Sequence, residues 1–338
     1  RSGIDVVRVP GLGRNPKPGA DLSALRSLRA SLSSYSPDVL HTHATKAGLL
    51  GRLASRGRPW PLVHTFHGHV LEGYFSKPVS SALTWSERML AASTSKILAV
   101  SERTREDLLR LKVAPAHKLA VVTPGVALDE LLGLDLVEAS AGAGFRERCG
   151  CAEGEVLVVV VGRLASVKRP LVALEAFCRA ASREPRLRLA FVGDGAERTA
   201  LEASLAELPS ALRERVTLQG AMASILPVLA GADLVLLSSR SEGMPVALIE
   251  AAAAAVPVVA TPVGGVPELV VHGETGRLAE DAVGLGLSLV ELARHEHLRR
   301  SMGLAARGRV RVRHSGAALA DRLEGVYSSV REELQCAS

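Results

Sequence analysis

The chain has 338 residues, 47% of them hydrophobic and 22% charged, and this length exceeds what one hydrophobic core usually fills, so two domains are expected. No stretch approaches the roughly 20 consecutive apolar residues that a membrane-spanning helix needs, and the composition is that of a globular protein. The formal net charge of +6 is unevenly distributed, because residues 1–150 hold 20 Lys and Arg against 13 Asp and Glu, and the remainder holds 21 against 22.

The first half alternates short β-branched runs with amphipathic stretches, a pattern typical of β-α-β units around a parallel sheet. The chain opens inside an apparent strand at residues 4–9, so we expect the natural start of the protein to lie upstream. Ser101 is a good N-cap for a helix at residues 102–111. The other expected elements are strands at residues 39–41, 62–66, 96–100 and 119–123 and a helix at residues 46–55.

From about residue 125 to residue 155 the periodicity fades, and residues 139–144 are all small, so the connection between the domains is expected there. A second series of elements follows, with strands at residues 156–161, 187–192, 216–218, 234–237 and 258–260 and final helices at 282–293 and 317–333. We therefore predict an N-terminal domain at residues 1–138, a C-terminal domain at 139–314, and a C-terminal helix at 315–338 that packs back on the first domain.

Residues 238–250 form the segment richest in chemistry, because they follow a buried strand and begin a helix. Pro245 suits the first helical position, where its missing N–H costs nothing. The free N–H groups of that helix open at the carboxyl edge of the sheet, where open α/β sheets bind ligands, and they suit phosphate. Glu242 and Glu250 can reach one ligand from two directions and accept hydrogen bonds from paired hydroxyls of a ribose or hexose. The alternative is that Glu242 caps the helix and Glu250 pairs with a neighbouring base.

A second segment, residues 161–170, places two cations after another apolar strand. Gly162 permits a tight exit from the strand, Arg163 offers a planar fork and Lys168 a point charge, which together suit a diphosphate. The alternative is a solvated basic loop. Glycines also follow strands at residues 193–195 and 264–265, where an ordinary loop is the favoured interpretation.

Histidines gather at strand ends in the first half, with His43 and His67 expected at the carboxyl ends of two strands. A metal site is disfavoured, because the helical H-E-x-x-H pattern, a Cys-rich partner and an Asp-x-Asp clamp are all missing. Hydrogen bonding to substrate, or a satisfied buried imidazole, is the favoured interpretation. The other members of this group are His41, His64 and His69.

Partners are predicted from charge and aromatic residues. The basic first half predicts an anionic partner, and an aromatic content of 3% leaves little for base stacking, which argues against nucleic acid. Tyr74, Phe75 and Trp85 lie close together in the sequence; core positions are the favoured interpretation, and a surface that meets a lipid-linked acceptor or the membrane is the alternative. The four cysteines show neither a disulfide framework nor metal spacing, so free thiols in a reducing cytosol are expected.

Together these segments resemble family 4 of the retaining glycosyltransferases, which have the α/β GT-B architecture of two Rossmann-like domains whose parallel sheets face a central cleft. The likeness spans most of the chain. Its most specific part is E-x7-E from Glu242 to Glu250, followed by G-R-L-x-x-x-K-R at residues 162–169 and G-G-x-P-E-L-V at 264–270. The motifs H-T-H at residues 41–43 and H-T-F-H-G at 64–68 are also similar to that family.

The resemblance implies transfer of a sugar from a nucleoside diphosphate, with uridine the expected base, to a hydroxyl of a glycan or lipid-linked acceptor. The anomeric configuration would be retained, and neither a metal nor another cofactor is expected. Arg163 and Lys168 would hold the diphosphate, Glu250 the ribose and Glu242 the transferred sugar. His67 would lie near the donor sugar and His43 on the acceptor side. The backbone contacts to the donor would come from Gly162, Gly243, Met244, Pro245 and Val246.

The resemblance also implies that the family's first β-α unit, with its glycine-rich loop, lies upstream of residue 1. The family's usual Pro-Asn-Gly-Ile-Asp link reads Thr123-Pro124-Gly125-Val126-Ala127 here, so the contacts of its Asn and Asp are not expected. A cytoplasmic enzyme at the inner face of the membrane is the expected setting. Two other functions stay open: a GT-B sugar-nucleotide epimerase, which uses the same donor pocket, and a non-catalytic module that binds anionic partners through its basic surface.

Overall fold

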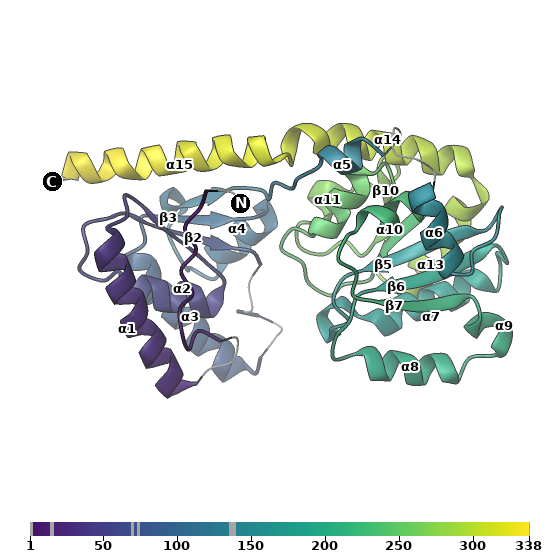
Figure 1. Cartoon of the computed structure of the whole chain (residues 1–338), viewed down its shortest axis with the longest axis horizontal. Coiled ribbons are helices and arrows are strands. Elements are labelled where there is room, and N and C mark those ends of the chain that lie inside the picture. The colour runs from purple at the N-terminus through teal and green to yellow at the C-terminus, as the bar shows by residue number, and fades with distance from the viewer. Residues whose placement is uncertain (1–2, 14–16, 69–70, 73–74, 135–139, 338) are drawn as a thin grey trace. The chain divides into compact units, whose positions relative to one another are not determined.

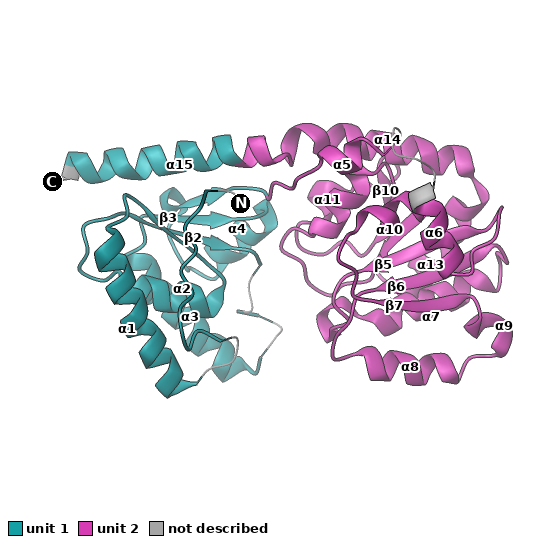
Figure 2. Cartoon of the chain, in the orientation of Figure 1, with its two compact units in different colours: residues 1–123, 320–338 teal, residues 124–319 magenta. Residues whose placement is uncertain are grey.

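The computed structural model describes residues 3–13, 17–68, 71–72, 75–134 and 140–337. It divides into two compact units, each with its own parallel sheet (Figures 1 and 2). Unit 1 comprises residues 1–123 and 320–338, and unit 2 comprises residues 124–319. The predicted fold class, two α/β domains with parallel sheets, is confirmed.

The sheet of unit 1 has four parallel strands in the order β1-β2-β3-β4. Its middle strand β2 is buried along its whole length, as a strand covered on both faces should be. Ser101 caps α4 as predicted, since its Oγ accepts from the amide of Thr104 at 3.1 Å. The strands are β1 (Leu40–His43), β2 (Leu62–Phe66), β3 (Lys96–Ala99) and β4 (Leu119–Val121). The helices of unit 1 are α1 (Pro18–Tyr35), α2 (Thr45–Ala54), α3 (Lys77–Ala92), α4 (Glu102–Arg110), η1 (Ala116–Lys118) and the greater part of α15 (Gly316–Ala337).

Helix α2 lies close to the β1-β2 pair because its inward face carries glycine. A Cβ at Gly48 would lie 2.4 Å from Cε1 of His64, so no larger residue fits there without displacing that ring. Farther along α2, the buried Arg52 donates to Glu87 of α3 at 2.6 Å, and neither side chain is more than 3% exposed. This buried ion pair fastens α2 to α3 beneath the sheet.

The sheet of unit 2 has six parallel strands in the order β10-β9-β8-β5-β6-β7. The order reverses between β5 and β8, and this switch point is where open α/β sheets bind ligands. Helices α7 and α13 pack side by side, with Phe177 and Leu285 in the core beneath them. The strands are β5 (Val156–Val161), β6 (Leu187–Val192), β7 (Val216–Gly220), β8 (Leu234–Leu237), β9 (Val258–Ala260) and β10 (Gly276–Leu278). The helices are α5 (Asp129–Leu132), α6 (Ser140–Arg148), η2 (Ser166–Lys168), α7 (Pro170–Ala181), α8 (Arg198–Ala206), α9 (Ser210–Arg213), α10 (Leu226–Gly231), α11 (Val246–Ala253), α12 (Val266–Leu269), α13 (Ala282–Arg294) and α14 (Glu296–Arg313).

Two expectations about the N-terminal half and the connection were wrong. Residues 4–9 are not a strand, because the ladders in the described part of unit 1 join only β1 to β4, and Ile4, Val6 and Val7 are exposed. The region from residue 125 to residue 155 is not the connection between the domains, since it lies within unit 2 and contains α5 and α6.

The units divide the chain at 123/124 and 319/320, not at 138/139 and 314/315 as expected. The segment after residue 123 joins unit 2 through contacts with α14 and the residues after it. The amide of Val126 donates to the carbonyl of His314 at 2.8 Å, and Arg307 donates to the carbonyl of Leu132. These contacts join residues that are far apart in the sequence, so no local pattern of residues predicts them. Among the helices of the described residues, none is long and apolar enough to cross a membrane.

Candidate functional site

The loops that leave β5 and β8 meet at the point where the strand order of unit 2 reverses. Nζ of Lys168, after β5, donates to Oε1 of Glu242, after β8, at 2.5 Å. The same carboxylate oxygen accepts from Oγ of Ser239 at 2.5 Å. Two residues that are 74 positions apart and were predicted to serve one ligand are therefore in direct contact.

The two loops are also locked together through backbone atoms. Arg169 adopts a left-handed φ of 48° and donates from Nε to the carbonyl of Ser238 at 2.7 Å. Oγ of Ser238 in turn lies 2.9 Å from the carbonyls of Lys168 and Arg169, and the amide of Arg240 donates to the carbonyl of Val167. Sequence reasoning missed Arg169 and the two serines; the Lys-Arg pair directly before Pro170 was visible, but its role depends on the neighbouring strand.

Glycine permits the close approach of loops that the chain brings together here. A Cβ at Gly193 would lie 1.9 Å from the carbonyl oxygen of Gly162, and one at Gly264 would lie 1.7 Å from the carbonyl oxygen of Glu242. Both glycines also have positive φ, of 144° and 54°. Their function is to let the backbone around Gly162 and Glu242 pack without a gap.

Helix α11 begins at Val246, so Pro245 is its N-cap and not its first helical residue as predicted. The reason is the extended backbone of Pro245, with ψ of 109°, while its carbonyl accepts from the amides of Leu248 and Ile249. Gly243, Met244 and Pro245 are buried, and Val246 is exposed. The helix therefore starts directly behind the Lys168–Glu242 contact, and its first N–H groups have no side-chain cap.

Both structural alternatives for the glutamates are wrong. Glu242 does not cap the helix, because its carboxylate bonds to Lys168 and Ser239. Glu250 is half-buried, and no side chain in the described part of the chain forms a hydrogen bond or ion pair with it. Burial raises the pKa of Glu250. Arg163 is exposed, and within the described ranges its guanidinium has no partner either.

In unit 1 the histidines lie on both faces of the β1-β2 pair. His64 is buried, and its Nδ1 forms a hydrogen bond with the Thr42 hydroxyl at 2.9 Å. It is therefore the histidine of the group that fits the prediction of a buried, hydrogen-bonded imidazole. Burial first, and Arg52 second, lower its pKa to about 2. On the other face, Nδ1 of His43 lies 2.9 Å from Nε2 of His67. The pKa values of both rings are lowered by partial burial. The predicted donor-side and acceptor-side histidines thus touch one another.

No group of three or more His, Cys, Asp or Glu side chains in the described part of the chain is arranged to hold a metal ion. The four cysteines are free, as predicted. Phe75 and Trp85 are exposed by 53% and 63%, so the core interpretation of the aromatic stretch is wrong for both. Tyr74 and His69 lie outside the described residues.

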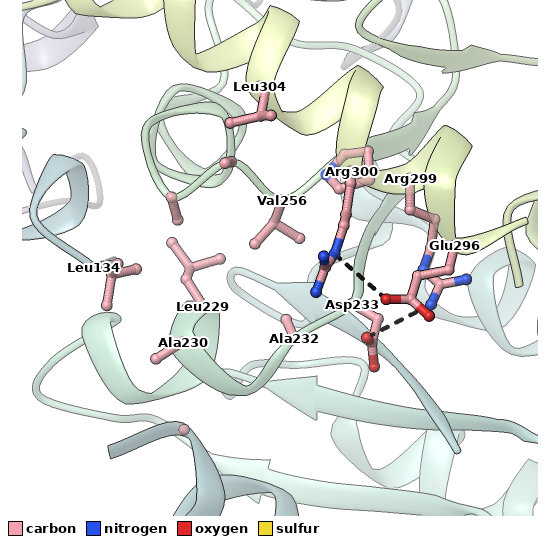
Figure 3. Close-up of a pocket in the computed structure, with 14 residues that line it drawn as sticks. Leu134, Leu229, Ala230, Ala232, Asp233, Val256, Glu296, Arg299, Arg300 and Leu304 are labelled. Atoms are coloured by element: carbon pink, nitrogen blue, oxygen red, sulfur yellow. Dashed lines mark ion pairs between the residues drawn. The ribbon is translucent and has the colours of Figure 1, made fainter. Parts of the chain in front are cut away.

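Unit 2 also contains a cavity of about 570 Å³ that sequence reasoning did not anticipate (Figure 3). It opens beside Asp233 and Val256, at the amino ends of β8 and β9, and so at the edge of the sheet opposite Lys168. Its charged side chains neutralise one another, because Arg300 pairs with Glu296 at 3.4 Å and Arg299 lies 4.0 Å from Asp233. We assign it no ligand.

Two family models, both of glycosyl transferases, match this chain. The model described as Glycosyl transferase 4-like domain matches residues 1–125, and the model described as Glycosyl transferases group 1 matches residues 155–295. UDP-Gal:alpha-D-GlcNAc-diphosphoundecaprenol alpha-1,3-galactosyltransferase of Escherichia coli is 29% identical over 80% of this chain and 70% of its own length. N-acetyl-alpha-D-glucosaminyl L-malate synthase of Bacillus anthracis is 27% identical over 93% and 80%. HepE of Anabaena, solved with UDP and glucose, superposes with a TM-score of 0.80 at 20% identity, covering 90% of this chain and 81% of HepE, and this likeness shows the fold alone.

Proposed function

Because this chain belongs to family 4 of the GT-B glycosyltransferases, we propose that it transfers a sugar from uridine diphosphate to a hydroxyl of a glycan or lipid-linked acceptor, with retention and without a metal. Membership of a glycosyltransferase family makes the chain an enzyme that uses a nucleotide sugar. The base, the stereochemistry and the acceptor are the parts that we propose.

The donor would bind at the carboxyl edge of the unit 2 sheet. Negative charge develops on the departing diphosphate, and preorganised cations and helix N–H groups are most effective when aimed at such a charge. Lys168, Arg163 and the start of α11 behind Pro245 would supply them, together with backbone groups of Gly162 and of Gly243 to Val246. The half-buried carboxylate of Glu250 would accept from the ribose hydroxyls, and Glu242, which Lys168 already orients, would contact the transferred sugar.

In this proposal no side chain acts as nucleophile. The leaving phosphate accepts the proton of the acceptor hydroxyl on the face where the new bond forms, which retains the anomeric configuration. His67 would lie beside the donor sugar and His43 toward the acceptor. Since no metal takes part, turnover should survive an excess of chelator, and loss of activity with EDTA that magnesium restores would refute the metal-free part.

The observation that carries the proposal is the contact of Lys168 with Glu242 at the switch point of the sheet. A ligand that binds only the folded state raises the unfolding temperature, so a panel of nucleoside diphosphates and their sugars is the direct test. UDP and a UDP-sugar should stabilise the protein, and the corresponding adenosine and guanosine compounds should not. Stabilisation by none of them would overturn the assignment of the donor, and stabilisation by another base would correct it.

A lipid-linked acceptor and work at the inner face of the membrane are supported by two observations. The name of the Escherichia coli relative includes a diphosphoundecaprenol acceptor. In this chain, Phe75, Trp85 and Met89 are exposed in and beside α3, and the same helix carries the cations Lys77 and Arg88. Exposed apolar side chains combined with cations are what an anionic bilayer surface binds.

A further inference from the structure

Three imidazoles form a row on one face of the unit 1 sheet. His41 and His43 share this face because side chains alternate along β1, and His67 follows the end of the neighbouring strand β2. The ring centroids of His41 and His43 are 4.2 Å apart, and those of His43 and His67 are 5.1 Å apart. Each ring is therefore packed against the next.

The inner end of the row is held at both ring nitrogens. Nδ1 of His41 lies 2.6 Å from the hydroxyl of Tyr327 on α15, and its Nε2 lies 2.7 Å from Oγ1 of Thr65 on β2. With both nitrogens engaged the ring cannot turn without losing a hydrogen bond. His43 stacks on a fixed surface, so its own orientation is restricted in turn.

At the outer end, Nδ1 of His43 and Nε2 of His67 are 2.9 Å apart, a distance at which one hydrogen lies between them. A neutral imidazole carries a hydrogen on only one of its nitrogens. The hydrogen bond between Nδ1 of His43 and Nε2 of His67 therefore decides whether the hydrogen of His67 lies on Nε2 or on Nδ1. Nδ1 of His67 is then an acceptor if Nε2 carries the hydrogen, and a donor if Nε2 does not.

Partial burial lowers the pKa of each ring, and His67 lowers that of His43 further, so the neutral imidazoles are favoured. The other titratable groups around the row are His41 beside it, Tyr327 on α15, and His64 and Arg52 behind the sheet. Among the residues that the structure describes, no carboxylate acts on the pKa of either ring. The hydrogen bond between the two rings, and not a charge on either, then sets the tautomer of His67.

We propose that His43 is a positioning residue, whose Nδ1 holds Nε2 of His67 so that His67 meets the donor sugar as one tautomer in one orientation. This role is additional to the acceptor-side position proposed above, and it rests on the proposed function for the part that concerns the sugar. The restraint itself belongs to unit 1 and does not depend on which donor binds.

The restraint can be measured without substrate. Long-range ¹H–¹⁵N spectra of the ¹⁵N-histidine-labelled full chain report which nitrogen of each ring carries hydrogen. In the native protein the two nitrogens of His67 should have the separate shifts of one neutral tautomer. His43→Leu should bring them toward the averaged shifts of exchanging tautomers, and His43→Asn, whose amide occupies the place of Nδ1, should restore the separation. Averaged shifts in the native protein, or unchanged shifts in His43→Leu, would refute the restraint.

Measurements of turnover then test whether this restraint of His67 contributes to catalysis. With UDP-sugars as the probe, release of UDP should fall by up to about 100-fold in His43→Leu through kcat, as expected for a misplaced contact, and recover largely in His43→Asn. His117→Leu, an exposed histidine of the same unit, is the matched control and should change neither readout. His43→Ala serves the same comparison if the leucine variant does not fold.

The two readouts separate the two hypotheses. Fixed His67 shifts in a protein that neither binds nor turns over a UDP-sugar would count against the proposed function alone. Normal turnover in His43→Leu, with the tautomers of His67 released, would overturn the positioning role while leaving the donor site intact.

Discussion

Lys168→Ala is the perturbation that tests the donor site most directly. Its Nζ lies 2.5 Å from Oε1 of Glu242, whose side chain is 9% exposed, so the substitution removes a cation and leaves the carboxylate with the hydroxyl of Ser239. Loss of one preorganised contact to developing charge should lower kcat by about 10²–10³-fold. The half-satisfied carboxylate should lower the free energy of unfolding by about 1–3 kcal/mol.

Release of UDP from the donor identified by thermal shift measures the first quantity, and urea unfolding measures the second. Arg300→Ala is the control, because it removes an exposed cation of the same unit at the opposite edge of the sheet. A cycle with Glu242→Gln should show coupling of about 0.5–3 kcal/mol in stability, as for residues in contact. A folded Lys168→Ala protein with kcat within a few-fold of the native value would refute the reasoning.

Three further predictions concern unit 1. Glu87→Ala leaves the buried Arg52 without its ion-pair partner and should lower the free energy of unfolding, measured in urea, by about 3–5 kcal/mol. The double variant, in which Leu and Met replace the two charged residues, should lose less, and equal losses would contradict this. Folding lowers the pKa of His41 to about 4, chiefly by burial, so the unfolded chain binds more protons between about pH 4 and 6.5. Stability should therefore be full above pH 6.5 and decline toward pH 4, and His41→Gln should flatten that decline in unfolding curves recorded at several pH values. Trp85→Ser with Met89→Ser should weaken co-sedimentation with vesicles of phosphatidylglycerol and phosphatidylcholine several-fold, while Val312→Ser, at an exposed apolar site of unit 2, should not; retention of full binding by the double variant would exclude α3 as the membrane surface.

The secondary structure of the C-terminal domain was easier to predict from the sequence than that of the N-terminal domain. Strands β5, β8 and β9 of unit 2 are continuous apolar runs, because both faces of a parallel sheet are covered, and this signal is local. The sequence did not predict strand β10 and helix α6, because a three-residue strand and an Ala-Gly helix have little hydrophobic periodicity. Residues 4–9 misled for the opposite reason, since an apolar run becomes a strand only where a partner supplies the hydrogen bonds.

For the candidate site, the spacing of Glu242 and Glu250 and the cations after Gly162 were legible in the sequence, because a motif lies on one turn and one helix. That Lys168 meets Glu242, that Arg169 fastens the two loops, and that His43 meets His67 were decided by the tertiary structure. Each of these contacts joins segments that leave different strands, and the distance between two such segments depends on strand order and register. Strand order is a property of the folded sheet, and no local pattern of residues encodes it.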